Sequence, residues 1–221
     1  QSVTGGGLVS KLYISVQGLM AVALYHLKRP VAYCYNREAA FLATGKRHPI
    51  KIIMKTGVDK DGKLLAMHAR FLANGGAYGS YGIAVVTRAA VHATGPYEIP
   101  NVDVEALEVY TNQTFRGAMR GFGTPQAAFA SESQLDLHAE ALGIDPLEIR
   151  LRNALRPGGV IGTGQVLKDG CGIVPCLEEV KPHYEKALGE WAKQPASAPT
   201  RRRGVGLGAM WYGIGNTAAQ N

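Results

Sequence analysis

The pattern that most restricts how this chain can fold is a pair of alternating apolar segments joined by a turn. Residues 49–56 place apolar side chains such as Ile50 and Ile52 at every second position, and residues 64–72 return with similar strand-forming character. The Asp-Lys-Asp-Gly sequence of residues 59–62, between the two segments, is typical of a tight turn. The sequence therefore predicts a β-hairpin with one face buried against other elements.

Helical patterns on both sides of this hairpin indicate what covers that face. Helices are expected over residues 16–29, 126–142, 146–153 and 176–191, and further strand-like segments over residues 31–35, 102–110 and 204–208. Pro30 ends the first helix, Gly143 suits the C-cap of the second, and Asp145 suits the N-cap of the third, with Pro146 in its first turn. The chain is therefore expected to be α+β, with mixed sheets and packed helices.

The charge and cysteine content narrows the classes of partner. Twenty-four Lys and Arg against 17 Asp and Glu give a net charge of +7, which favours anionic ligands. The one tight basic run, Arg201 to Arg203, has no aromatic residues for base stacking and follows a Pro/Ala-rich stretch. Residues 194–203 are therefore interpreted as a solvated linker, and no nucleic-acid partner is expected.

Cys34, Cys171 and Cys176 make neither a disulfide framework nor a zinc site. Without a membrane segment or signal pattern, a cytoplasmic protein is expected.

Three glycine-rich stretches and two isolated side chains are candidates for chemistry. The stretches are residues 5–7, 116–123 and 213–217, and none follows a strand and opens a helix as a dinucleotide or phosphate-binding motif would. Arg88 lies inside an apolar run, where it either faces an anionic ligand or carboxylate or extends its charged end to solvent. Phe122 stands between two glycines, which leaves its ring free to contact a flat ligand.

Four motifs in order carry a family resemblance. The segment Arg120-Gly121-Phe122-Gly123-Thr124-Pro125-Gln126 resembles the cofactor loop of the xanthine dehydrogenase/aldehyde oxidase family, and residues 44–49, 97–102 and 147–153 match the same family in order and spacing. The resemblance spans nearly the whole chain. It implies that residues 1–193 form the first molybdopterin-binding domain of a large subunit, with its N-terminal part missing. Residues 194–203 would then be the linker and residues 204–221 the start of the second such domain.

The resemblance also implies an activity and a set of partners. The expected cofactor is a molybdopterin-type molybdenum cofactor, and the expected reaction is oxidative hydroxylation of an N-heterocycle or aldehyde with water as the oxygen source. Iron-sulfur clusters and FAD are expected on other subunits or segments, together with the remainder of the large subunit. The chain alone is expected to be inactive. The alternative is a catalytically incomplete fragment, retained for binding or assembly.

Four site residues are assigned by matching positions to the family. Arg88 matches the arginine that orients the substrate and balances charge during the reaction. Phe122 matches the aromatic residue that stacks on a heteroaromatic substrate. Arg120 matches the loop residue whose backbone approaches the molybdenum, and Gly121 beside it matches the same cofactor loop.

The remaining matched positions include departures from the purine-oxidising members of the family. Gly7 and Leu8 match a second cofactor loop, but Leu8 stands where those enzymes have Phe, and Leu12 where they have a substrate-binding Glu. Thr217 matches a substrate-contacting threonine, whereas Asn216 replaces a second stacking Phe. These changes predict a substrate other than xanthine, such as a polar or carboxylated heterocycle.

Overall fold

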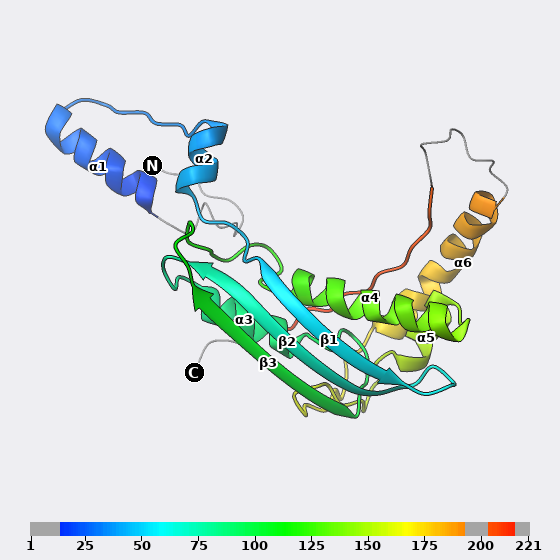
Figure 1. The fold of residues 1–221 in the computed structure, drawn as a ribbon. Helices are drawn as coiled ribbons and strands as arrows, with labels where there is room; N and C mark the ends of the chain where they lie inside the picture. The colour runs from blue at the N-terminus through cyan, green and yellow to red at the C-terminus, as the bar shows by residue number, and fades with distance from the viewer. Residues whose placement is uncertain (1–13, 193–202, 215–221) are drawn as a thin grey trace.

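The computed structural model describes residues 14–192 and 203–214, in which a three-stranded sheet is accompanied by six helices. In chain order the elements are α1 (Ser15–Leu27), α2 (Arg37–Ala43), β1 (Ile50–Val58), β2 (Leu64–Gly76), α3 (Gly82–Val91), β3 (Asn101–Tyr110), α4 (Thr124–Leu142), α5 (Pro146–Asn153) and α6 (Ile173–Ala192). Figure 1 shows α1 and α2 beyond one end of the sheet and α6 beyond the other. Across the described ranges, none of the helices combines the length and apolarity needed to cross a bilayer.

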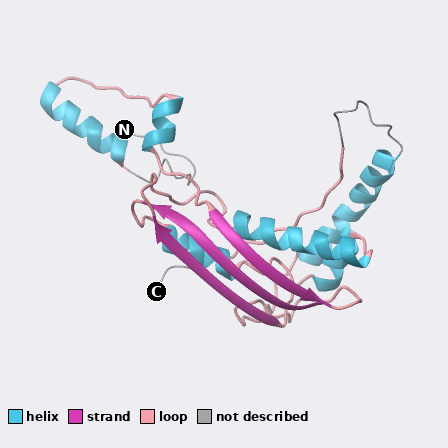
Figure 2. Ribbon diagram, viewed as in Figure 1, coloured by secondary structure: helices cyan, strands magenta, loops and turns pink. Residues whose placement is uncertain are grey.

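The sheet has the order β1-β2-β3 and is mixed. β1 and β2 pair antiparallel as the predicted hairpin, and the Asp59 carboxylate closes their turn by accepting from the N–H groups of Asp61 and Lys63 at 2.9 and 2.8 Å. β2 and β3 pair in parallel, with α3 in the crossover between them. The expected α+β class with a mixed sheet is confirmed, and the parallel pair brings the C-terminal ends of β2 and β3 to the same end of the sheet (Figure 2).

The core lies on one face of this sheet. Ala69 and Phe71 of β2 are fully buried and share a cluster with Ala89 of α3 and with Ala127 and Leu135 of α4. The alternate residues of the strands face away from this cluster and are largely exposed, because strand side chains point to opposite faces in turn. Both α3 and α4 therefore cover the same face, and they meet each other there.

Helix boundaries agree closely with the sequence where capping chemistry is strong. α5 begins after Asp145, whose carboxylate accepts from the N–H groups of Leu147 and Glu148, and α4 ends at Gly143 in the left-handed conformation that suits glycine. Two expected strands are wrong. Residues 31–35 and 204–208 have no strand, because neither segment finds a partner strand with which to hydrogen bond.

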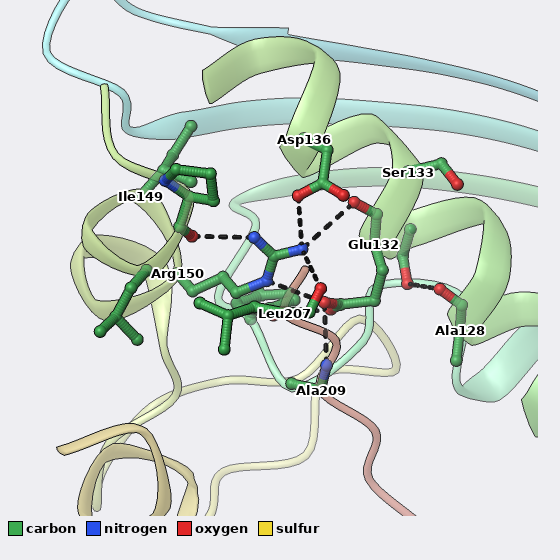
Figure 3. Close-up of polar contacts among 12 residues, drawn as sticks. Ala128, Glu132, Ser133, Asp136, Ile149, Arg150, Leu207 and Ala209 are labelled. Atoms are coloured by element: carbon green, nitrogen blue, oxygen red, sulfur yellow. Dashed lines mark hydrogen bonds and ion pairs between the residues drawn. The ribbon is translucent and has the colours of Figure 1, made fainter. Parts of the chain in front are cut away.

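An ionic network centred on the buried Arg150 joins α4 and α5 to the C-terminal described segment (Figure 3). The Arg150 guanidinium of α5 contacts the carboxylates of Glu132 and Asp136 on α4 at 2.9 and 2.8 Å. It also donates to the Leu207 carbonyl at 3.2 Å, while the N–H of Ala209 donates to Glu132 at 2.9 Å. Residues 203–214 are therefore held against α4 and α5 by side chains as well as by packing.

Candidate functional site

The glycine-rich loop before α4 has an unusual backbone. Gly121, Phe122 and Gly123 all have positive φ, at 92°, 51° and 93°. This conformation costs a bulky residue such as Phe122 roughly 1–3 kcal/mol, so the surroundings must enforce it. The Phe122 N–H donates to the Met119 carbonyl at 2.7 Å and the Thr124 N–H to the Gly121 carbonyl at 2.9 Å, which closes two consecutive turns. Strain of this kind is concentrated at functional sites.

Helix α3 is the element that holds this loop. A Cβ atom added at Gly123 would lie 2.2 Å from the Val85 carbonyl oxygen and 3.1 Å from the Ala89 amide nitrogen, so the backbones are in direct contact. The Phe122 ring lies edge-on to the ring of Tyr81, the N-cap of α3, with centroids 6.4 Å apart. Only glycine permits this close approach at position 123.

Arg88 lies on this same helix, beside Ala89. It is 2% exposed, so the possibility that its charged end reaches solvent is wrong. The guanidinium lies over the Tyr212 ring, 4.3 Å from its centroid, and donates to the Gly213 carbonyl at 3.2 Å. Tertiary packing thus brings the helix that carries Arg88 against the loop that carries Phe122, as expected if both residues serve one site.

The segment before β1 anchors the loop from the other side. The Arg47 guanidinium donates to the Arg120 carbonyl at 2.7 Å and reaches the Gln126 side-chain oxygen at 3.4 Å. Gln126 in turn donates to the His48 carbonyl at 3.1 Å. The Arg120 side chain itself is exposed. Arg47 was not predicted as a functional residue, although it lies in one of the recognised motifs.

A cluster of cations surrounds the start of the loop. Burial and the nearby charge of Arg116 lower the pKa of Lys46. A cavity of about 580 Å³ is lined by Lys46 and Met119 and by residues of α1 and α2, among them Arg37. These two helices lie beyond the end of the sheet where β2 and β3 finish (Figure 1). Among the described residues, no acceptor is found for the backbone N–H groups of Met119 and Arg120. Free backbone donors beside clustered cations suit an anionic group such as the phosphate of a cofactor.

His92 is a further buried residue at this place. It follows α3, is 1% exposed, and contacts the backbone of Arg88 and Gly213 as well as the rings of Trp211 and Tyr212. The sequence analysis did not single it out. His92 follows Arg88 by four residues, so both side chains lie on one side of a helical turn. This spacing is the sequence signal that could have identified His92.

Four of the assigned residues cannot be placed in this geometry. Gly7 and Leu8 precede the first described range, and Asn216 and Thr217 follow the last one. They lie outside the described residues, so their assigned contacts with cofactor and substrate stay predictions.

Comparison with known proteins identifies relatives of this arrangement. The family described as molybdopterin cofactor-binding domain matches residues 1–154. The nicotinate dehydrogenase large molybdopterin subunit of Eubacterium barkeri is 46% identical over 189 residues, which cover 86% of this chain and 44% of that protein. The aldehyde oxidoreductase of Megalodesulfovibrio gigas is 37% identical over 211 residues, which cover 96% of this chain and 23% of that protein. The chain therefore spans less than half the length of these relatives.

The fold is similar to that of a solved structure as well. The aldehyde oxidoreductase from Desulfovibrio gigas superimposes with a TM-score of 0.80 at 36% identity, over 88% of this chain and 21% of that protein. The overall fold described above thus also occurs in an aldehyde oxidoreductase of known structure.

Proposed function

The chain belongs to the molybdopterin cofactor-binding domain family, and from this premise we propose that it forms part of a molybdenum hydroxylase that oxidises an N-heterocycle or aldehyde with water as the oxygen source. The observation that carries this proposal is the contact between α3, with its buried Arg88, and the strained loop Gly121-Phe122-Gly123. A buried cation thus lies close to a loop whose backbone N–H groups can donate hydrogen bonds. This combination suits an anionic cofactor and a substrate that gains negative charge during the reaction.

The residues present fit such a cofactor. The loop N–H groups of Met119 and Arg120 have no acceptor among the described residues, and Lys46 and Arg37 supply positive charge at the cavity that they line. Gly7 and Leu8 would complete the contacts from the second cofactor loop. When bound, the cofactor would supply a metal centre that activates water at neutral pH. The remainder of the large subunit and iron-sulfur and flavin centres on other segments or subunits would complete the enzyme.

Arg88 is the residue of this chain that we assign to the reaction itself. Its guanidinium is fixed by the Tyr212 ring and the Gly213 carbonyl, so it needs little reorganisation to stabilise charge that develops on a substrate. The Phe122 ring, half-buried at the loop apex, would offer one face on which a flat substrate stacks. Residues 204–221 would begin the second cofactor-binding domain and bring Asn216 and Thr217 to the same substrate.

A carboxylated N-heterocycle is the substrate class that we favour. The relative with 46% identity is named a nicotinate dehydrogenase, and nicotinate is a pyridine carboxylate. Where the purine-oxidising members of the family that the chain resembles have a second stacking Phe, this chain has Asn216. Its amide offers two N–H donors and a carbonyl acceptor in place of ring contact. Both features support a polar, single-ring substrate over xanthine.

The test is the substitution Arg88→Met in the full-length, cofactor-loaded enzyme. Losing an electrostatic stabiliser of the transition state lowers turnover by about 100-fold or more. We expect that loss in kcat/KM with nicotinate, an unchanged molybdenum content by elemental analysis, and a wild type that prefers nicotinate to xanthine. Arg70→Met, at an exposed ion pair with Glu105 on the sheet, is the control and should leave turnover unchanged.

Two results would contradict the proposal. Equal losses of molybdenum and activity in Arg88→Met would identify the arginine as a structural residue. A wild type selective for xanthine would remove the argument from Asn216 and from the nicotinate-named relative.

A further inference from the structure

The imidazole of His92 contacts two distant parts of the chain at once. Its Nδ1 lies 2.8 Å from the Arg88 carbonyl oxygen, and its Nε2 lies 2.9 Å from the backbone nitrogen of Gly213. The ring stacks on Tyr212 at 5.8 Å and lies tilted against Trp211 at 5.2 Å between centroids. His92 is thus the place where α3 meets the last described residues of the chain.

These two contacts define the protonation state of the ring. A backbone N–H can only donate and a backbone carbonyl can only accept. The Gly213 N–H must therefore donate to an unprotonated Nε2, and a protonated Nδ1 must donate to the Arg88 carbonyl. The imidazole is neutral and has a single tautomer, because a doubly protonated ring would direct one N–H at another. Burial lowers the pKa of His92, which is consistent with a neutral ring at neutral pH.

Arg88 and His92 hold the same peptide unit from two sides. While His92 accepts from the Gly213 N–H, the Arg88 guanidinium donates to the Gly213 carbonyl. The guanidinium also covers the Tyr212 ring, on which the His92 ring stacks. Displacing residues 211–213 would therefore remove the two described contacts that orient the guanidinium.

We propose that His92 is a positioning residue for the reaction: as a neutral, Nδ1-protonated acceptor it fixes Trp211, Tyr212 and Gly213, and through them the guanidinium of Arg88. This deepens the proposed function and rests on it for the role of Arg88.

Two substitutions separate this role from simple packing. The side-chain amide of glutamine reaches about as far as Nε2 of histidine, so His92→Gln can still accept from the Gly213 N–H. The amide of asparagine reaches only about as far as Nδ1, so His92→Asn keeps the contact with Arg88 and loses the one with Gly213. Both replace the ring with a primary amide, and only the glutamine amide is placed to accept from the Gly213 N–H.

The first measurement is amide hydrogen exchange by mass spectrometry on the full-length protein without cofactor, in the peptide that contains residues 211–213. Losing one hydrogen bond should make this peptide exchange about tenfold faster in His92→Asn. His92→Gln should stay within about threefold of the wild type. Equal exchange in the two variants overturns the proposal, whatever the enzyme's activity.

The second measurement is steady-state kinetics of the loaded enzyme. A misplaced Arg88 stabilises the transition state less well, so His92→Asn should lose about tenfold in kcat with KM within about twofold, and His92→Gln should recover most of it. Faster exchange with unchanged kcat would refute the positioning role. If Arg88→Met is itself fully active, the proposed function of Arg88 fails separately, and the exchange result still decides whether His92 holds Gly213.

Discussion

Substituting Arg150 by methionine should be among the most destabilising single changes in this chain. The Arg150 side chain is fully buried and ion-pairs with Glu132, whose side chain is 11% exposed, and with Asp136, which is 54% exposed. Glu132 also accepts from the Tyr97 hydroxyl at 2.6 Å and from the Ala209 N–H. The substitution removes the one cation from this group and leaves the Glu132 carboxylate buried.

The expected magnitude follows from that remaining charge. Removing one partner of a buried ion pair costs about 3–5 kcal/mol, because the other charge stays uncompensated, whereas total stabilities are about 5–15 kcal/mol. Methionine fills much of the volume, so the cavity contribution is small. A second substitution, Glu132→Gln, in the Arg150→Met variant removes the uncompensated negative charge. The glutamine amide oxygen can still accept from the Ala209 N–H. The double variant should therefore be more stable than Arg150→Met alone.

Equilibrium unfolding in urea, followed by circular dichroism, measures these differences. Arg152→Met is the matched control on the same helix, since Arg152 forms an exposed ion pair with Glu148 and should lose less than about 1 kcal/mol. Equal losses for Arg150→Met and Arg152→Met would refute the reasoning. A double variant less stable than Arg150→Met would show that the Glu132 carboxylate stabilises the fold through its hydrogen bonds with Tyr97 and Ala209 even without Arg150, which contradicts the reasoning.

Two further predictions concern the ends of α4 and the dependence of stability on pH. Gly123→Ala should cost at least twice the roughly 1 kcal/mol expected for Gly143→Ala, because both have positive φ but only Gly123 contacts another backbone; urea midpoints of the two variants decide this. Burial lowers the pKa of His48 to about 4 and also lowers that of His92, so the unfolded chain binds more protons than the folded one below pH 6.5. Stability should fall from pH 7 to pH 5, by up to about 1.4 kcal/mol per pH unit for each histidine, and fall less in His48→Gln. Burial raises the pKa of Glu108, and this opposes part of the fall in stability. A protein that is more stable at pH 5 than at pH 7 would contradict the lowered pKa values of the two histidines.

Local patterns in the sequence predicted those elements whose cause is local. The hairpin of β1 and β2 followed from alternation and a turn, and α5 from the cap at Asp145. Residues 31–35 have the composition of a strand but lie where no partner strand runs, so composition alone gave the wrong answer. Strand formation depends on a neighbour, and the neighbour is a property of the whole fold.

The candidate site divides in the same way. Family motifs in the sequence predict the roles of Arg88 and Phe122, and the flanking glycines already indicated an unusual loop. Only the tertiary structure showed that Gly123 contacts α3, and that His92 and Gly213 form a hydrogen bond across 121 positions of sequence. A bond between residues so far apart leaves no periodic or spacing signal, because chain folding alone brings its two ends together.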